Sequence, residues 1–169
     1  VIKSLNLGHN LGLNNDVKGI INCAINKNLL NRKRIGVTEY LAAKCKIKDN
    51  SETMLLKNDK ISISPITTHV DIKQIHKIIN SKLIVTKVKT IDKWFKKRHK
   101  KKPKIAILGL NPHNAELRND SEEKKIIIPA INKLKKQSIN VHGPIPADTI
   151  FLDEFKKYDV IVGMFHDQV

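Results

Sequence analysis

Two short, uninterrupted apolar runs constrain the fold of this chain more than any other feature. They are residues 105–110 (IAILGL) and 160–165 (VIVGMF), and neither contains a charged side chain. A strand buried on both faces of a parallel sheet has this composition, whereas a strand with one wet face alternates apolar and polar residues. The chain is therefore expected to fold around a buried, largely parallel sheet.

Helical patterns separate the expected strands. Residues 60–69 alternate apolar and polar positions, which predicts a strand with one better-buried face. A helix with Asp71 as its N-cap is expected over residues 71–82, and a second helix around residues 91–98. Strands that alternate with helices imply crossover connections, so the fold class is α/β with helices on the faces of the sheet.

A third helix is expected after the first apolar run. Asp120 and Glu123 resemble a capping box, apolar residues follow at helical spacing, and Pro129 is a candidate kink. Residues 143–149 (GPIPADT) are then expected to form a rigid loop that is rich in turns.

The formal charge of +16 is the feature that most suggests a nucleic-acid partner. Only four of the 32 basic residues are arginine, however, and bidentate phosphate and base contacts favour arginine. The densest basic run, residues 96–104 (KKRHKKKPK), is expected to be a solvated linker. The alternative function is that of a non-catalytic basic fragment that binds nucleic acid or another polyanion. A nucleic-acid partner is not the main expectation.

Neither the cysteines nor the apolar segments point away from an ordinary globular protein. Cys23 and Cys45 lie far apart, without the spacing of a disulfide framework or a zinc knuckle. No run of about 18 apolar residues exists, and the first residues lack the apolar core of a signal peptide. We expect a cytoplasmic protein with no membrane partner.

Three of the seven histidines directly follow an expected strand: His69, His113 and His166. A parallel sheet brings the carboxyl ends of its strands to one edge, where ligands bind. Imidazole binds zinc and other first-row divalent ions, and three protein ligands leave a position open for water or substrate. The pattern alone leaves two interpretations open, because a histidine at a strand end is also commonly a loop residue bonded to backbone.

The carboxylates nearby are ambiguous on the same grounds. Asp148 could orient a histidine or a substrate amine, since metal-bound imidazoles need carboxylate or carbonyl acceptors, or it could stabilise a turn. Asp167, beside His166, has the same two interpretations. The chain contains neither a Walker-type phosphate loop nor G-x-G-x-x-G, so a nucleotide site would have to be built differently.

Seven segments in order along the chain carry a resemblance to a known family. They are residues 24–27 (AINK), 36–39 (GVTE), 67–69 (TTH), 107–113 (ILGLNPH), 128–130 (IPA), 143–151 (GPIPADTIF) and 164–168 (MFHDQ). Together they resemble 4-hydroxythreonine-4-phosphate dehydrogenase. The resemblance implies a three-layer α/β/α enzyme of the isocitrate and isopropylmalate dehydrogenase type, which works as a homodimer with active sites shared across the interface.

The resemblance also implies a reaction and its residues. NAD accepts hydride from 4-phosphohydroxy-L-threonine, and the keto acid loses carbon dioxide to give 3-amino-2-oxopropyl phosphate for pyridoxal phosphate synthesis. The implied ligands of a divalent metal, which could be zinc, cobalt, magnesium or manganese, are His69, His113 and His166. Thr38 is implied to bind substrate, and Asp148 to lie at the substrate as a catalytic or binding residue.

Several positions depart from the family pattern. Val37 stands where the family has a histidine against the substrate, Ala24 replaces a proline, and residues 114–118 replace a glycine-rich turn, which should strain or reshape that loop. The sequence stops at Val169, before the family's residues for substrate phosphate and NAD. Residues 1–169 are therefore expected to be the substrate- and metal-binding portion of a truncated, divergent dehydrogenase, with activity or substrate choice altered.

Overall fold

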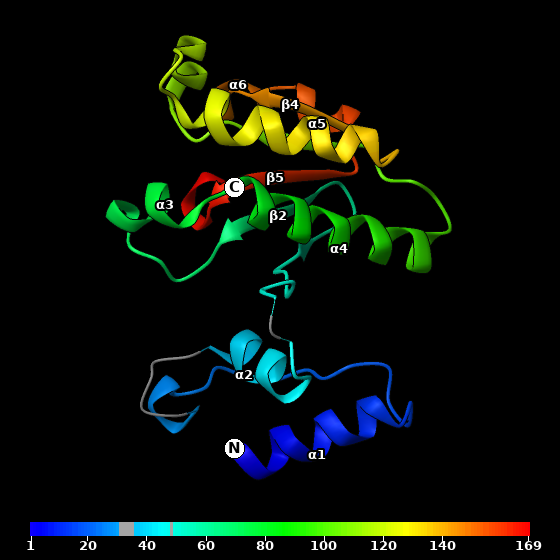
Figure 1. Cartoon of the computed structure of the whole chain (residues 1–169). Helices are drawn as coiled ribbons and strands as arrows, with labels where there is room; N and C mark the ends of the chain where they lie inside the picture. Colours follow the sequence, from blue (N-terminus) through cyan, green and yellow to red (C-terminus); the bar gives the residue numbers. More distant parts are fainter. Residues whose placement is uncertain (31–35, 48) are drawn as a thin grey trace. The chain divides into compact units, whose positions relative to one another are not determined.

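The computed structural model describes residues 1–30, 36–47 and 49–169, in two compact units, Val1–Glu52 and Thr53–Val169 (Figure 1). The first unit contains helix α1 (Ile2–Leu13), a 3-10 turn (Lys27–Leu30) and helix α2 (Val37–Lys44). Tyr40 of α2 donates a hydrogen bond from its hydroxyl to Asn6 Oδ1 of α1 at 2.7 Å. This bond ties the two helices of the first unit together.

The second unit is built on a five-stranded sheet with the order β1-β2-β5-β3-β4. Its strands are β1 (Leu56–Lys57), β2 (Ser62–Thr67), β3 (Ile105–Leu108), β4 (Val141–Ile145) and β5 (Val160–Phe165). β1 pairs antiparallel with β2, and the other four strands are parallel. The expected α/β class is confirmed.

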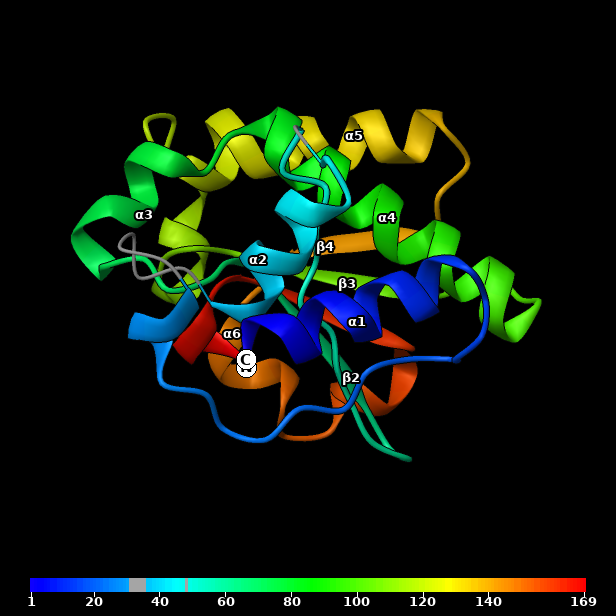
Figure 2. The ribbon, with the colours of Figure 1, turned by 90° about the horizontal axis from the view of Figure 1, so that it is seen from below.

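Helices cover the sheet on both faces. The longest, α4 (Ser81–His99), lies beside α5 (Ile128–Lys136) in both views of the ribbon (Figures 1 and 2). A core of aliphatic side chains from these two helices packs on one face of the sheet, and Ile84 and Val88 of α4 are fully buried there. Burying each such side chain stabilises the fold by about 1.5–3 kcal/mol. A smaller cluster on the opposite face includes Ile150 of α6 (Ala147–Ile150) and Phe155.

The buried strands match the expectation with two corrections. β5 has the expected bounds, whereas β3 ends at Leu108, two residues early. The expectation of one better-buried face was wrong for β2, where five of six residues are buried. β2 lies between β1 and β5, so its backbone is paired on both sides. Its two faces are also covered, because Ile66 joins the larger core and Ile63 packs against the smaller one.

The helices after β2 differ from the expected pair. The first, α3 (Ile72–Ile78), ends where Ile79 turns extended. Asn80 then caps α4, because its Oδ1 accepts from Leu83 N at 2.9 Å. Asp71 does occupy the N-cap position of α3, but its side chain makes no capping bond. The expected second helix is the C-terminal half of α4, and no described helix is both long and apolar enough to cross a membrane.

The segment expected to be a loop at 143–149 contains the end of a strand and the start of a helix. β4 runs through Gly143 and Pro144, and α6 carries Asp148. Proline is tolerated in β4 because this strand lies at the edge of the sheet, where only β3 pairs with it. Glycine and proline are typical of turns, so the sequence pattern predicted a loop where the structure has an edge strand.

Candidate metal and substrate site

Three neighbouring parallel strands, β2, β5 and β3, each lead into one of the three histidines. His69 comes two residues after β2, and His166 directly follows β5. His113 lies in the turn Pro112–Leu117 after β3. All three side chains are exposed. Since parallel strands end at the same edge, the topology places the three residues at one edge of the sheet.

Each of two histidines faces a carboxylate at this edge. His113 Nδ1 lies 3.9 Å from Asp148 Oδ2, and His166 Nδ1 lies 2.9 Å from Asp167 Oδ1. Imidazoles with carboxylate neighbours are a donor set that suits a divalent metal ion. Within the described part of one chain, however, no group of three or more histidine, cysteine or acidic side chains is placed to hold an ion. The donor types fit a metal, and the three-ligand set stays a prediction.

The turn that carries His113 has an unusual backbone. Residues 113–117 all have positive φ, from 48° at Ala115 to 55° at Leu117, and none is glycine. The left-handed conformation costs about 1–2 kcal/mol for each residue with a Cβ. The expectation that losing the glycines would strain this loop therefore agrees with its backbone. Contacts from outside the turn must hold it in place.

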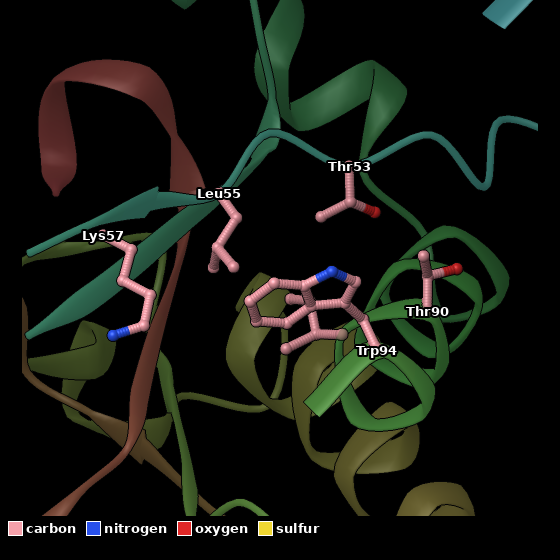
Figure 3. A pocket seen from close by; sticks show the side chains of 6 residues that line it. Thr53, Leu55, Lys57, Thr90 and Trp94 are labelled. Carbon is pink, nitrogen blue, oxygen red and sulfur yellow. The ribbon is translucent and has the colours of Figure 1, made fainter. Parts of the chain in front are cut away.

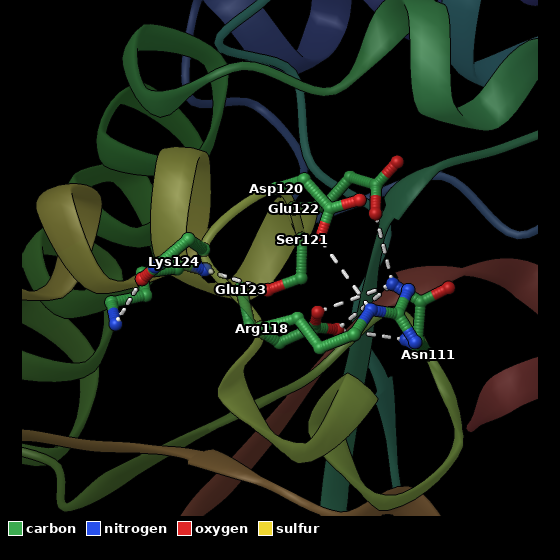
Figure 4. A network of polar contacts seen from close by, with 8 residues as sticks. Asn111, Arg118, Asp120, Ser121, Glu122, Glu123 and Lys124 are labelled. Carbon is green, nitrogen blue, oxygen red and sulfur yellow. Dashed lines mark hydrogen bonds and ion pairs between the residues drawn. The ribbon is translucent and has the colours of Figure 1, made fainter.

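Glu123 supplies the strongest of these contacts (Figure 4). Its Oε1 accepts hydrogen bonds from Leu110 N and Asn111 N, each at 2.8 Å, and its Oε2 accepts from Asn111 Nδ2 at 3.1 Å. The side chain is completely buried. Burial by itself raises the pKa of the Glu123 carboxyl, but the hydrogen bonds to Asn111 and Leu110 outweigh it and leave the pKa below its usual value.

This role of Glu123 differs from the expected capping box. The helical segment begins with a π-helical turn (Glu123–Ile127) that leads into α5, with Pro129 in the first turn of that helix. Ser121 Oγ accepts from Lys124 N at 3.3 Å, so serine acts at the helix start. The Glu123 carboxylate points instead to the chain that leaves β3.

Asn114 connects the same turn to β4. Its Nδ2 donates to Pro144 O at 3.0 Å, while its Oδ1 is buried without a hydrogen-bond partner among the described residues. Gly109 makes this arrangement sterically possible, because a Cβ there would overlap Asn114 Oδ1 and come within 3.2 Å of Glu123 Oε1. Asp148 follows shortly after Pro144, in α6, so this contact ties the His113 turn to the segment that bears Asp148.

Thr38 lies in the first unit, in the first turn of α2. Beside it, Val37 lines a pocket of about 410 Å³ together with Ala24, Ile25 and Gly36. These residues come from the two segments that the resemblance places at the substrate. The pocket belongs to the first unit, while the histidines and Asp148 belong to the second.

Two pockets that the structure describes in the second unit contain none of the predicted site residues. One of about 380 Å³ lies between Leu55 and Lys57 on one side and Thr90 and Trp94 of α4 on the other (Figure 3).

The basic run 96–104 forms the end of α4 and the connection to β3. Two of its lysines are paired, Lys96 with Asp92 and Lys101 with Asp159.

Sequence reasoning missed Gln168 and Asn114 and gave Glu123 the wrong role. Gln168 lies in the turn His166–Gln168, where its amide bonds to backbone atoms of β5 and of Gly109, directly after β3. The only signal for these residues is their closeness in sequence to the strand-end histidines. Gln168 bonds to Met164, four residues away, but also to Gly109, 59 residues away, and the partner of Asn114 lies 30 residues away; no local pattern encodes the two distant bonds.

Comparisons with known proteins agree with this architecture. The family model described as "Pyridoxal phosphate biosynthetic protein PdxA" matches residues 1–169. The chain is 38% identical over 135 residues to a 4-hydroxythreonine-4-phosphate dehydrogenase of Sulfurihydrogenibium sp. (strain YO3AOP1), covering 79% of this chain and 41% of that protein. It is 34% identical over 164 residues to the D-threonate 4-phosphate dehydrogenase of Salmonella typhimurium, covering 94% and 49%.

A solved structure gives the same result. The 4-hydroxythreonine-4-phosphate dehydrogenase of Klebsiella pneumoniae superimposes with a TM-score of 0.86 at 30% identity, over 98% of this chain and 51% of that one. The chain thus spans about half the length of the relatives it matches. It belongs to the PdxA family of pyridoxal phosphate biosynthetic proteins.

Proposed function

We propose that this chain is the metal- and substrate-binding portion of an NAD-linked dehydrogenase that acts on a phosphorylated hydroxy acid. The observation that carries the proposal is the placement of His69, His113 and His166 after three neighbouring parallel strands of a PdxA-family fold. In such folds the carboxyl edge of the sheet is where ligands bind. The activity is that of the full-length relatives, of whose length this chain spans about half.

We propose further that the metal site is shared between two copies of the chain in a homodimer. Within one chain the described residues contain no group of three suitable ligands in position. The side chains of the three histidines are nevertheless exposed at the same edge, where a second copy can reach them. A two-fold symmetric interface forms two such sites, because each copy contributes the same residues to its partner's site.

The chemistry follows from this arrangement. A divalent ion held by the three imidazoles would supply a Lewis acid for the substrate hydroxyl and for the ketone formed from it. NAD, when bound, would supply the acceptor for the hydride that leaves the carbon bearing the hydroxyl, and the resulting keto acid would then lose carbon dioxide. Asp148, 3.9 Å from His113, can hold that imidazole in orientation or accept a hydrogen bond from the substrate amine. Thr38 can donate its hydroxyl proton to the substrate.

Two substrates are candidates, and they differ in one group. 4-Phosphohydroxy-L-threonine carries an amine where D-threonate 4-phosphate carries a hydroxyl. The relatives named for the two activities are 38% and 34% identical to this chain, so identity does not separate them. Val37 supports altered substrate choice, because it lines the pocket in the first unit with an apolar side chain.

Replacing Val37 with histidine is expected to change how tightly the chain binds these substrates. An imidazole in the pocket can make one hydrogen bond that valine cannot, worth about 1 kcal/mol or roughly fivefold in affinity. We expect Val37→His to tighten binding of 4-phosphohydroxy-L-threonine to the zinc-loaded chain by about that factor, measured by isothermal titration calorimetry. D-threonate 4-phosphate is titrated in parallel.

The matched control is Val17→His, which adds the same side chain at an exposed position of the first unit outside the pocket. It should leave both affinities unchanged. Equal affinities for the unaltered chain and Val37→His, with both substrates, would show that position 37 plays no part in substrate choice.

A further inference from the structure

The strands that lead to His113 and His166 separate before they end. β3 and β5 pair from Ile105↔Val160 to Ile107↔Val162, but β5 continues to Phe165. Beyond the last pair, no backbone ladder holds the two strands at a fixed distance. In open α/β sheets, the crevice outside such strand ends is where ligands bind. The distance between the two histidine turns must therefore be set by side chains.

Gln168 bridges this gap with both ends of its amide. Its Oε1 accepts a hydrogen bond from Met164 N of β5 at 2.7 Å, and its Nε2 donates to Gly109 O, directly after β3, at 2.6 Å. Met164 N–H and Gly109 C=O are a backbone donor and acceptor of the kind that a continued ladder would have paired. The side chain thus replaces the missing backbone pairing at the point where the strands diverge.

The local fold brings Gln168 back over β5. The turn His166–Gln168 reverses the chain above Gly163. A Cβ at Gly163 would lie 2.6 Å from Val169 Cγ1 and 3.2 Å from Gln168 Oε1. Only glycine leaves the space that lets the turn lie this close to the strand. The bridge made by Gln168 therefore requires glycine at position 163.

The bridge is anchored on both sides. Thr67, at the end of β2, is buried and donates its hydroxyl proton to Met164 O at 2.8 Å. Met164 is therefore held through its N–H by Gln168 and through its carbonyl by Thr67. On the β3 side, Gly109 is followed by Leu110 and Asn111, whose N–H groups bind Glu123. A continuous series of bonds to backbone atoms thus links the ends of the three strands that lead to the histidines.

We propose that Gln168 is a positioning residue, which fixes the turns that carry His113 and His166 relative to each other and thereby the position of the metal ligands that each copy contributes. The proposal rests on the proposed function, since it concerns the same histidines. Glutamine suits the task because its amide offers a donor and an acceptor at once. A carboxylate of the same shape would still accept from Met164 N but would place an oxygen against Gly109 O.

The test is the variant Gln168→Glu, with Gln137→Glu as its matched control. Gln137 is exposed at the end of α5 and is not part of the bridge. The probe is cobalt(II) alone, titrated into the full chain and followed by its visible absorption. We expect Gln168→Glu to weaken cobalt binding by about tenfold or more, in the range found when residues that orient metal ligands are replaced. Gln137→Glu should bind as the unaltered chain does.

A second measurement does not depend on any metal. Hydrogen exchange of the Met164 amide in the metal-free chain should be at least about tenfold faster in Gln168→Met, which keeps the length of the side chain but removes the acceptor for that N–H. The same variant is used in the cobalt titration if the carboxylate of Gln168→Glu prevents folding, and the same loss of cobalt affinity is expected for it.

The outcomes separate the two proposals. Cobalt affinity equal to that of the unaltered chain in a folded Gln168 variant would overturn the positioning role. An unaltered chain that binds no cobalt would contradict the proposed function. The exchange measurement then decides about the bridge: faster exchange at Met164 in the variant supports it, and an unchanged rate overturns it.

Discussion

Replacing Glu123 with alanine is expected to lower the free energy of unfolding by about 3 kcal/mol. The change leaves the N–H groups of Leu110 and Asn111 without the acceptor that each has at 2.8 Å. Each buried donor without a partner costs about 1–3 kcal/mol, and the left-handed turn that follows loses its main external support. Urea denaturation followed by circular dichroism measures the effect.

The neighbouring Glu122→Ala provides the control. Glu122 directly precedes Glu123, at the N-cap of the π-helical turn; it accepts one hydrogen bond, from Asn111 Nδ2 at 2.9 Å, and it is only partly buried. Its replacement should cost less than about 1 kcal/mol. Equal losses of unfolding free energy in the two variants would show that the backbone hydrogen bonds accepted by Glu123 stabilise the fold no more than the single bond accepted by Glu122.

The same carboxylate predicts a dependence of stability on pH. The pKa of Glu123 is lower in the folded chain than its usual value, because hydrogen bonds to the charged form outweigh the effect of burial. A group with a lowered folded pKa stabilises the fold above its unfolded pKa, about 4.3, and this contribution is lost as the pH falls through the folded pKa. The Glu123→Gln variant should lose part of the acid sensitivity below about pH 4.

Replacing any one of His69, His113 and His166 with alanine is expected to weaken zinc binding by about a hundredfold or more. Changing residues that only orient metal ligands already costs about 10–100-fold, so loss of a ligand should cost at least as much. The side chains are exposed, so their removal should leave the free energy of unfolding of the metal-free chain nearly unchanged. Competition with a chromogenic zinc chelator measures the affinity.

The control is His76→Ala, which removes an exposed imidazole from α3 that is not among the predicted metal ligands. Its zinc affinity should equal that of the unaltered chain. If all three site variants also bound zinc as tightly as the unaltered chain, the assignment of the metal ligands would be wrong.

Parts of this fold follow from local sequence patterns. The run Val160–Phe165 is a strand with the expected bounds, since a short apolar run has few other uses inside an α/β protein. The common edge of His69, His113 and His166 also follows, because it needs only that β2, β3 and β5 be parallel. Neither result requires knowledge of the packing.

The remaining features depend on tertiary contacts. The break between α3 and α4 is set by Asn80, whose side chain caps α4. The helical spacing of the isoleucines continues past this position and therefore does not reveal the break. β4 contains glycine and proline, which are typical of turns, and it is a strand because β3 offers an open edge. Glu123 has the spacing of a capping box, yet its carboxylate binds the backbone beyond β3, twelve and thirteen residues away.

The measurement that tests the shared metal site most directly is subunit mixing. The three single variants, His69→Ala, His113→Ala and His166→Ala, are combined in pairs, and zinc binding is measured before and after mixing. If one histidine of each site comes from one copy and two from the other, two of the three mixtures regain complete sites. With equal amounts and random pairing, about a quarter of the sites are complete, since half of the dimers are mixed and each has one intact site.

The third mixture should regain none, and it identifies the two histidines that come from the same chain. Zinc binding by the unaltered chain with no recovery in any mixture would contradict the account, because all three ligands would then belong to a single chain.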